Sequence, residues 1–479
     1  MLRLELVSQA VAGRLSGIRP EEAAALTPTA ISTDTRQIGA GALFVALSGE
    51  HFDAHEFVAA AFARGAVAAI VAESAIARVE KSLSGQFPNR ALPLVAVDDT
   101  RVALGALAAF WRARFSLPLI ALTGSNGKTT TKEMIAAILR AAYGEAAVLA
   151  TGGNFNNEIG LPLTLLRLHA GHRAAVIEMG MSHPGEIARL TGIARPTVAL
   201  VTNVQRAHLE GMGTLAAIAE EKGAIYDGLT EDGIAVINGD DPNAWLWRMQ
   251  NAGRRVIRYA TAFAADVAGR IKSHGLETRL SINAKEGESV VTLAVPGQHN
   301  ARNALAAAAA TLAAGVPFSA VMEGLNGYRG IKGRLQKRDG INGALLLDDS
   351  YNANPDSVRA GIDVLAAASG KRVLVFGDMG ETGSDAERFH EEIGIYAKKS
   401  GVDLMLTLGE MSAVAARAFG EHARSYEHPE ALTADLRPLL DRRTTVLVKG
   451  SRFMRMERIA DAIAASISPT DTKGGSTCC

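Results

Sequence analysis

A glycine-rich segment, Thr123-Gly-Ser-Asn-Gly-Lys-Thr-Thr130, follows an apolar run and precedes a helical pattern. In such a segment the glycines let backbone N–H groups converge on phosphate oxygens, and the positive end of the following helix favours anions. Lys128 could neutralise charge on the β- and γ-phosphates, and the Thr129 hydroxyl could bind Mg²⁺. The common phosphate-binding loop has a further glycine where this chain has Leu122. The segment nevertheless predicts nucleotide binding by Thr123, Gly124, Ser125, Asn126, Gly127, Lys128 and Thr129.

Three further residues could complete a phosphoryl-transfer site. Glu178 ends a buried-strand run, which places a carboxylate at the edge of a sheet where α/β enzymes bind their ligands and where it could hold Mg²⁺. His208 follows another strand run, and Lys222 lies in a helical stretch. Each also fits a simpler role, as a solvated strand-end carboxylate, a structural or exposed loop histidine and a solvated helix lysine. The residues alone leave both interpretations open.

Two loops carry an unusual density of polar groups. Asn154, Asn156 and Asn157 crowd amides into one loop, where they could orient a sugar or peptide or simply form a turn. The segment Asp348-Asp-Ser-Tyr-Asn-Ala-Asn-Pro355 follows a buried strand and is more polar than a turn requires. It therefore favours a binding loop.

Bulk properties limit the possible partners. The 479 residues suffice for about three domains, and 50 Lys plus Arg balance 50 Asp plus Glu. This balance gives no electrostatic reason to expect nucleic acid or an anionic membrane as partner. The longest stretch without a strongly polar residue, Ala304 to Val316, is too short for a bilayer. The chain begins with alternating apolar and charged residues, as in a short strand, and lacks the profile of a secretory signal.

The only cysteines, Cys478 and Cys479, stand at the extreme end and cannot crosslink a fold. A reducing compartment fits this usage, so we expect a cytoplasmic protein. No assembly signal is visible, and a monomer is the default expectation.

Strand and helix patterns alternate in three blocks, which predicts an α/β protein with mostly parallel sheets and a doubly wound third block. The expected strands are residues 43–47, 68–71, 94–97, 117–122, 174–177, 198–202, 234–237, 344–347, 373–376, 404–408 and 446–448. The expected helices include residues 57–64, 101–115, 134–142, 300–314 and 456–467. Residues 468–479 have the composition of a disordered tail.

Four motifs in matching order resemble the Mur ligase family over about residues 25 to 465. They are the glycine-rich segment above, Gly-Asn-Phe-Asn-Asn-Glu-Ile-Gly, Gly-Gln-His-Asn-Ala-Arg-Asn and Lys-Gly-Arg. Two pairs of segments narrow the resemblance to members that add D-alanyl-D-alanine to UDP-N-acetylmuramoyl-tripeptide. They are 32–36 with 43–53, and 348–355 with Gly377-Asp-Met-Gly-Glu-Thr-Gly383. The resemblance implies an ATP-dependent ligase of peptidoglycan and cell wall synthesis that forms an amide through an acyl phosphate.

The resemblance also implies the domains and their contents. Residues 1–100 would form a small α/β UDP-binding domain, 101–315 a central P-loop ATPase domain, and 316–467 a Rossmann-like ligase domain. The matching positions for the UDP end of the substrate are Ser32, Asp34, Arg36, Phe52 and Asp53. The loop with Asn154, Asn156 and Asn157 would reach the muramoyl part.

The remaining implied roles concern catalysis, ATP and the dipeptide. Thr129, Glu178 and His208 match Mg²⁺ positions, and Lys222 matches a lysine that the family carbamylates; with Lys128 they form the implied catalytic set. Asn303 matches a contact to the adenine of ATP, and Arg334 and Asp349 match further ATP contacts. The dipeptide pocket would be lined by Ser350, Tyr351, Asn352 and Asn354, with Lys449 as a further candidate.

Three alternatives compete with this interpretation. A folylpolyglutamate synthase-like ligase would lack a matching first domain. The Mur ligase that adds a diaminoacid carries Asp-Asn-Pro-Arg, whereas this chain has Asp240-Asp-Pro-Asn243 in a different block. A P-loop switch or transport ATPase would hydrolyse nucleotide without needing an amine.

Overall fold

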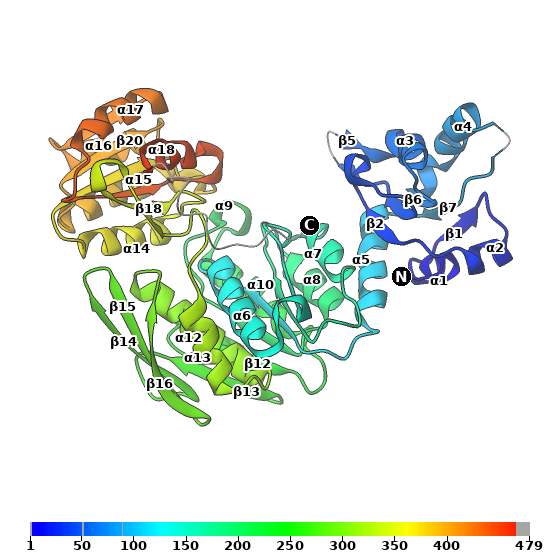
Figure 1. Cartoon of the computed structure of the whole chain (residues 1–479), viewed down its shortest axis with the longest axis horizontal. Coiled ribbons are helices and arrows are strands. Elements are labelled where there is room, and N and C mark those ends of the chain that lie inside the picture. Colours follow the sequence, from blue (N-terminus) through cyan, green and yellow to red (C-terminus); the bar gives the residue numbers. More distant parts are fainter. Residues whose placement is uncertain (1, 50–51, 89, 466–479) are drawn as a thin grey trace, which may run out of the picture.

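The computed structural model describes residues 2–49, 52–88 and 90–465. The expected tail at 468–479 and both cysteines lie outside these residues. Three mostly parallel sheets of five, nine and six strands follow one another along the chain, and a two-stranded hairpin accompanies the first. The predicted α/β class is confirmed. Figure 1 shows a central lobe with the amino-terminal and carboxyl-terminal lobes at opposite ends. The boundaries at residues 100, 315 and 467 stay a prediction.

The amino-terminal lobe has the strand order β1-β7-β6-β3-β2, in which only the β1–β7 pair is antiparallel. Its strands are β1 Arg14–Ser16, β2 Ala30–Ser32, β3 Ala42–Val45, β6 Ala68–Ala72 and β7 Leu94–Val97, with the hairpin β4 Ser48–Gly49 and β5 Phe52–Asp53. Its helices are α1 Leu4–Ala10, α2 Pro20–Ala25, α3 Val58–Ala63 and α4 Ile76–Gln86.

The expectation of a strand at the start of the chain is wrong, because these residues form α1. Leu4, Val7 and Val11 are buried at spacings of three and four residues, the period of a helix. Leu6, which an alternating strand would bury with Leu4, is only half-buried. Over so few residues the two periods overlap, and packing of the buried side chains in the apolar core selects the helix.

The central sheet has the order β16-β15-β14-β13-β12-β11-β8-β10-β9 and is parallel from β9 to β14. Its strands are β8 Leu119–Thr123, β9 Val148–Ala150, β10 Ala174–Glu178, β11 Val198–Val201, β12 Ile234–Asn238, β13 Arg255–Ala260, β14 Val267–His274, β15 Glu277–Ala284 and β16 Gly287–Leu293. Its helices are α5 Thr100–Arg112, α6 Lys128–Tyr143, α7 Gly160–Leu165, α8 Glu186–Ala194, α9 Leu209–Met212, α10 Leu215–Gly223, α11 Ala244–Gln250, α12 Gln298–Ala313 and α13 Phe318–Gly327.

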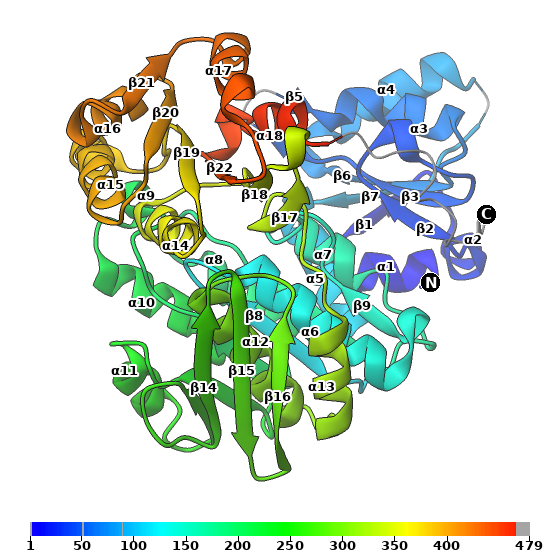
Figure 2. The same cartoon turned by 60° about the vertical axis from the view of Figure 1, so that its left-hand side comes forward.

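The antiparallel edge β14-β15-β16 was not expected from the sequence. Figure 2 shows these strands as three adjacent long arrows. Buried and exposed residues alternate along β15, so charged residues interrupt the apolar run by which the other strands are recognised. The alanine-rich α12 packs on this sheet beside α6 and α13, with Ala304 to Ala310 buried. Small side chains let the helix lie close to the strands.

The carboxyl-terminal sheet has the order β17-β18-β22-β19-β20-β21, with only the edge strand β17 antiparallel. Its strands are β17 Gln336–Asp339, β18 Leu345–Asp349, β19 Lys371–Gly377, β20 Leu404–Leu408, β21 Ala423–Tyr426 and β22 Thr444–Lys449. Its helices are α14 Pro355–Ala366, α15 Ala386–Lys399, α16 Ser412–Phe419, α17 Pro429–Leu436 and α18 Glu457–Ile463. One core packs α14 to α16 against the sheet, and a second packs α17 and α18, so the doubly wound arrangement is confirmed.

Helix α5 connects the first two lobes through an apolar core. Leu104 and Leu107 are fully buried in a cluster that also contains Ile70 and Val95 of the first sheet and Leu161 of the central lobe. Asp99 caps the helix by accepting hydrogen bonds from two backbone N–H groups. Within the described part of the chain, no helix combines the length and apolar character needed to cross a bilayer.

We expect Leu107→Ala to lower the free energy of unfolding by about 2–5 kcal/mol, because it removes buried methyl groups and leaves a cavity between the lobes. Val102→Ala is a matched control on the same helix, since Val102 is 69% exposed; it should change the unfolding free energy by less than about 0.5 kcal/mol. Urea denaturation followed by circular dichroism measures both. Equal effects would contradict the packing role of Leu107.

Candidate active site

The glycine-rich loop between β8 and α6 is held in close contact with two neighbouring elements. Gly124 has φ +153° and Gly127 has φ +78°, values that favour glycine. A Cβ atom on Gly124 would lie 1.8 Å from Thr202 Oγ1, after β11, and one on Gly127 2.3 Å from Asn303 Oδ1, in α12. The loop therefore requires glycine at both positions.

The segment after β11 fixes the loop by hydrogen bonds. Ser125 N donates to Asn203 O at 2.9 Å, and Asn126 N donates to Asn203 Oδ1 at 2.9 Å. Gln205 N donates to Ser125 Oγ at 2.9 Å. Sequence reasoning missed these supporting residues, although their polar run directly after a buried strand was a usable signal. They share the carboxyl edge of the sheet with the loop because β11 pairs in parallel with β8.

Lys128 folds back over the loop, where its Nζ donates to Gly124 O at 2.7 Å and Ser125 O at 3.3 Å. Burial lowers the pKa of Lys128, and Arg334 lowers it further, while the Glu178 and Glu381 carboxylates oppose the shift. A half-buried cation whose hydrogen-bond partners in the described chain are carbonyl oxygens would gain from a phosphate. A cleft lies between the central and carboxyl-terminal lobes; Ser125 to Thr129 line it, whereas Thr123 and Gly124 do not.

Glu178, at the end of β10, faces the start of α6. Its Oε1 accepts hydrogen bonds from Asn156 Nδ2 at 2.9 Å and Thr129 Oγ1 at 3.4 Å. Its Oε2 is buried and has no hydrogen-bond partner among residues 2–49, 52–88 and 90–465. Burying an unpaired carboxylate oxygen is unfavourable, and a bound cation would remove that penalty. Carboxylate and hydroxyl oxygens are suitable ligands for Mg²⁺.

His208 also lines the cleft and has φ +58°. Its Nδ1 lies 2.7 Å from Glu381 Oε2 of the carboxyl-terminal lobe, at ion-pair distance but outside hydrogen-bond alignment. The neighbouring imidazole lowers the pKa of Glu381. No three His, Cys, Asp or Glu side chains of the described chain converge on one point. A metal here would therefore need phosphate or water oxygens in addition.

Lys222, in α10, is 1% exposed and does not line the cleft. Burial, helped by the charge of Lys128, lowers the pKa of Lys222 well below its usual value. The environment thus favours a neutral amine, which is the reactive form of a lysine.

The polar loop after β18 meets the glycine-rich loop directly. Asn354 caps α14 and exchanges two amide hydrogen bonds with Asn126, at 2.8 and 3.2 Å. Tyr351 and Asn352 line the same cleft. Ser350 does not, because its buried hydroxyl donates to Asp348 at 2.6 Å.

Three charged residues in or beside this loop also line the cleft. They are Arg334, Asp349 and Lys449. Lys449 Nζ donates to Asp349 Oδ2 at 2.6 Å and to Asn352 O at 2.9 Å. The Arg334 guanidinium stacks 4.1 Å from the Tyr351 ring and donates to Thr129 Oγ1 at 3.4 Å. The central and carboxyl-terminal lobes therefore share one polar site.

A further ion-pair cluster joins these lobes, and two of its members, Arg206 and Asp356, line the cleft. Arg206 donates to Asp356 at 2.7 Å and to Glu392 at 2.8 Å, and Arg359 also donates to Glu392 at 2.9 Å. Hydrogen bonds from Arg206 lower the pKa of Glu392. This connection was not anticipated from the sequence, because a lone arginine after a strand has no recognisable partner in the chain.

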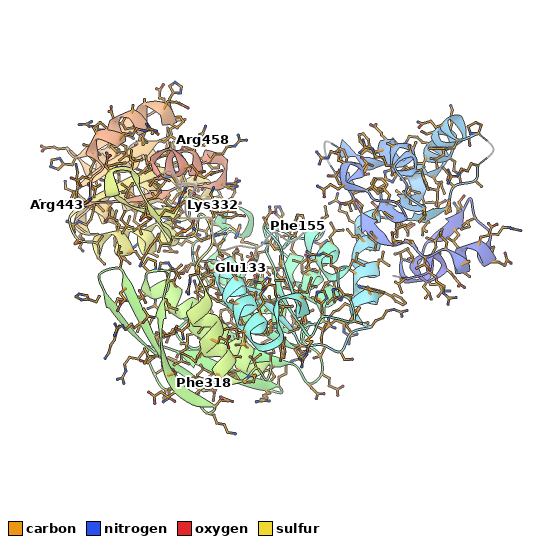
Figure 3. All side chains as sticks on the ribbon, viewed as in Figure 1. Glu133, Phe155, Phe318, Lys332, Arg443 and Arg458 are labelled. Atoms are coloured by element: carbon orange, nitrogen blue, oxygen red, sulfur yellow. The ribbon has the colours of Figure 1, made fainter. Side chains whose placement is uncertain are left out.

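The loop with Asn154, Asn156 and Asn157 could form a turn or orient a ligand, and its contacts support both interpretations. Asn157 Oδ1 accepts from Gly160 N at 2.9 Å, which stabilises the turn, whereas Asn156 contacts Glu178. Asn154, Asn156 and Asn157 all line the cleft. Figure 3 shows Phe155, which is 53% exposed, at the edge of the central lobe that faces the other two lobes.

The five candidate residues of the first lobe do not line this cleft. Asp34 pairs with Arg36 at 2.7 Å on the surface. Asp53 is held by His55 at 2.6 Å and Arg78 at 2.7 Å, and Phe52 is 55% exposed. Ser32 Oγ donates to Asp34 O at 2.9 Å. In Figure 1, β2 and β5, which carry Ser32, Phe52 and Asp53, lie on the side of the amino-terminal lobe that is turned toward the rest of the molecule.

Three family models match successive parts of the chain. They are the Mur ligase family catalytic domain at residues 27–112, the Mur ligase middle domain at 122–311, and the Mur ligase glutamate ligase domain at 333–452. The UDP-N-acetylmuramoyl-tripeptide–D-alanyl-D-alanine ligase of Escherichia coli (strain K12) is 42% identical over 451 residues, which cover 92% of this chain and 95% of that protein. The chain belongs to the Mur ligase family.

Solved structures of the family match this ligase closely. A crystal structure of MurF from Acinetobacter baumannii has a TM-score of 0.84 at 33% identity, covering 96% of this chain and 98% of that one. MurF of Thermotoga maritima, solved in complex with ADP, has a TM-score of 0.78 at 28% identity, covering 91% and 97%. The three-lobed arrangement is thus shared over nearly the whole length of the Mur ligase chains compared.

We expect Gly124→Ala to weaken ADP binding by about 100-fold or more, because the added methyl group displaces the phosphate-binding loop from Thr202. Gly152→Ala is the matched control, since a Cβ there would meet no atom within 4 Å. Isothermal titration calorimetry of both variants measures the change. Unaltered affinity for ADP in Gly124→Ala would show that this loop does not bind the phosphates.

Proposed function

We propose that this Mur ligase joins D-alanyl-D-alanine to UDP-N-acetylmuramoyl-tripeptide with ATP, in peptidoglycan precursor synthesis. Relatives with that name match nearly the whole chain. The observation that carries the proposal is the pair of amide hydrogen bonds between Asn126 and Asn354. This pair brings the nucleotide loop and the polar loop of the third lobe into one cleft of about 1220 Å³. A phosphorylated acid and an attacking amine can meet there.

The reaction begins with a carboxylate, which resists attack because it is negative and has no good leaving group. Its oxygen attacks the γ-phosphorus of ATP, ADP leaves, and an acyl phosphate forms. Lys128 would offset charge on the transferring group, and positioning supplies much of the remaining rate. Thr129, Glu178 and His208 would hold Mg²⁺, which supplies further charge compensation when bound. Asn303 would contact the adenine of the nucleotide. Arg334 and Asp349 would contact ATP from the third lobe.

The dipeptide amine then attacks the acyl carbon. The N–C bond forms, the C–O bond to phosphate breaks, and inorganic phosphate leaves. Tyr351, Asn352 and Asn354 would hold the dipeptide, with Lys449 orienting Asn352 through its carbonyl. Ser350 would act only indirectly, by ordering the loop through Asp348.

The other substrate must bridge two lobes. Its UDP end would bind at Ser32, Asp34, Arg36, Phe52 and Asp53, and the muramoyl part at Asn154, Asn156 and Asn157. Because ATP would lie on the central lobe and the dipeptide on the carboxyl-terminal lobe, the proposal requires these two lobes to close on each other, which would also exclude water from the acyl phosphate. A monomeric state and a cytoplasmic location are part of the proposal.

We expect ADP release to require both UDP-N-acetylmuramoyl-tripeptide and D-alanyl-D-alanine, because the acyl phosphate is discharged by the amine. Lys128→Ala should lower the rate by about 10³-fold or more while the nucleotide-sugar peptide still binds. A coupled ADP assay and calorimetry measure the two quantities. A P-loop ATPase would instead release ADP at the same rate without the amine, and that result would contradict the proposal.

Carbamylation of Lys222 by CO₂ is proposed from its burial and lowered pKa, since the neutral amine is the form that attacks CO₂. We expect protein equilibrated with ¹³C-bicarbonate to show a carbamate carbon signal by NMR that Lys222→Met removes. Lys132→Met is the matched control, because Lys132 is equally buried but pairs with Glu133 and donates to Thr151 O at 2.9 Å. A signal that persists in Lys222→Met would reject the assignment.

A further inference from the structure

The cleft between the central and carboxyl-terminal lobes contains several carboxylates, and their partners differ. Acidic side chains that line it in the described structure come from both lobes; they are Glu178, Glu186, Asp240, Asp241, Asp349, Asp356 and Glu381. D-alanyl-D-alanine carries an ammonium group that must be brought to the acyl carbon. A carboxylate with free acceptor capacity is the group that would recognise it.

Most of these carboxylates already have strong partners. Asp349 pairs with Lys449 at 2.6 Å, and Asp356 pairs with Arg206 at 2.7 Å. The other three accept hydrogen bonds from the protein as follows: Glu186 from Ser182 N and His183 N, Asp240 from Thr261 N and Oγ1, and Asp241 from Val204 N and Asn243 N. An incoming ammonium would have to break these bonds to use any of the five.

Two carboxylates remain, and they lie on different lobes. Glu178 faces Thr129 and Asn156 on the nucleotide side. Glu381 belongs to the lobe that carries the dipeptide loop, and its side chain is 60% exposed. Its one close charged contact in the described chain is His208 Nδ1 at 2.7 Å, without hydrogen-bond alignment. Glu381 therefore retains acceptor capacity at the junction of the two lobes.

The backbone at Glu381 is constrained to present this side chain. Glu381 has φ +57°, a left-handed conformation that a non-glycine residue adopts only when its surroundings enforce it. The preceding Gly380 N donates to Ser451 Oγ at 2.7 Å, and Ser451 Oγ in turn donates to Ala353 O in the dipeptide loop at 3.2 Å. The turn that carries Glu381 and the dipeptide loop are thus tied together through one hydroxyl.

We propose that Glu381 binds the ammonium group of the incoming dipeptide and positions its nitrogen toward the acyl phosphate. The proposal rests on the function proposed above. The ammonium loses one proton to water before attack and a second after the N–C bond forms, as phosphate leaves with the C–O electron pair. Glu381 acts as a fixed negative charge throughout.

We expect Glu381→Gln to raise the KM for D-alanyl-D-alanine by about 10- to 100-fold, the range set by loss of one charge-assisted hydrogen bond. The KM values for ATP and for UDP-N-acetylmuramoyl-tripeptide should change by less than about twofold. Glu387→Gln is the matched control, because Glu387 is exposed nearby on α15 and does not line the cleft. Steady-state kinetics of both variants measure the effect, and an unchanged dipeptide KM in Glu381→Gln overturns the proposal.

A second measurement separates ammonium binding from an effect through His208. Positional isotope exchange in ATP, measured with UDP-N-acetylmuramoyl-tripeptide and no dipeptide, should be the same in Glu381→Gln and the unaltered protein. If Glu381→Gln lowered the rate of isotope exchange as much as it lowered the rate of amide synthesis, Glu381 would act in the transfer of the phosphoryl group. That result would overturn the proposal. Absence of exchange in the unaltered protein would instead contradict the proposed function itself.

The substrate side provides a complementary test. D-lactyl-D-alanine has a hydroxyl where the dipeptide has its ammonium, so its inhibition constant should differ by less than about twofold between Glu381→Gln and the unaltered protein. An equal loss of affinity for this analogue would mean that the substitution distorts the pocket as a whole, and the ammonium assignment would be wrong.

Discussion

The close approach of the glycine loop to Thr202 and Asn303 determines where every other functional group must lie. A Cβ on Gly124 or Gly127 would overlap these side chains, so the loop can lie this close to them only with glycine at both positions. Backbone hydrogen bonds from Ser125 and Asn126 to Asn203 fix it to the end of β11. Because β10 and β11 both pair in parallel with β8, Glu178 and His208 are brought to the same edge.

The lobes are joined by two chemically different interfaces. Helix α5 connects the first two lobes through fully buried leucines, an interface that resists separation. The central and third lobes instead meet through Asn126 with Asn354 and Arg206 with Asp356, which are polar pairs. Polar pairs can exchange partners with water or substrate at little net change in free energy, so this boundary is the one suited to admitting ligands.

The charged groups in and near the cleft are arranged as in a binding site rather than as in a stabilised core. Lys222 is buried, and its pKa is lowered by desolvation and by Lys128. Glu178 keeps one buried oxygen without a partner in the described structure, and Glu381 adopts an unfavourable backbone conformation. Each feature is unfavourable in the isolated chain, a pattern typical of functional sites, and a ligand or modification could compensate for the buried lysine and the unpaired oxygen.

The sequence by itself determined the α/β class, the glycine-rich turn between β8 and α6 and most parallel strands. Apolar runs, glycine spacing and helix periodicity are local properties that survive without knowledge of the fold. The helix at Leu4 to Ala10 and the antiparallel β14 to β16 were missed because short or alternating patterns fit more than one structure.

Only the tertiary structure decided which polar groups are free. Ser350 and Asn354 belong to one polar loop. The Ser350 hydroxyl donates to Asp348 of its own lobe, whereas the Asn354 amide donates to Asn126 of the central lobe. Arg206 carried no recognisable signal of its own, and the segment 377–383 narrowed the resemblance without giving Glu381 a role, because the partners of both residues lie far away in the chain. Hydrogen-bond capacity depends on which distant residues folding brings within about 3 Å, and no local pattern encodes that.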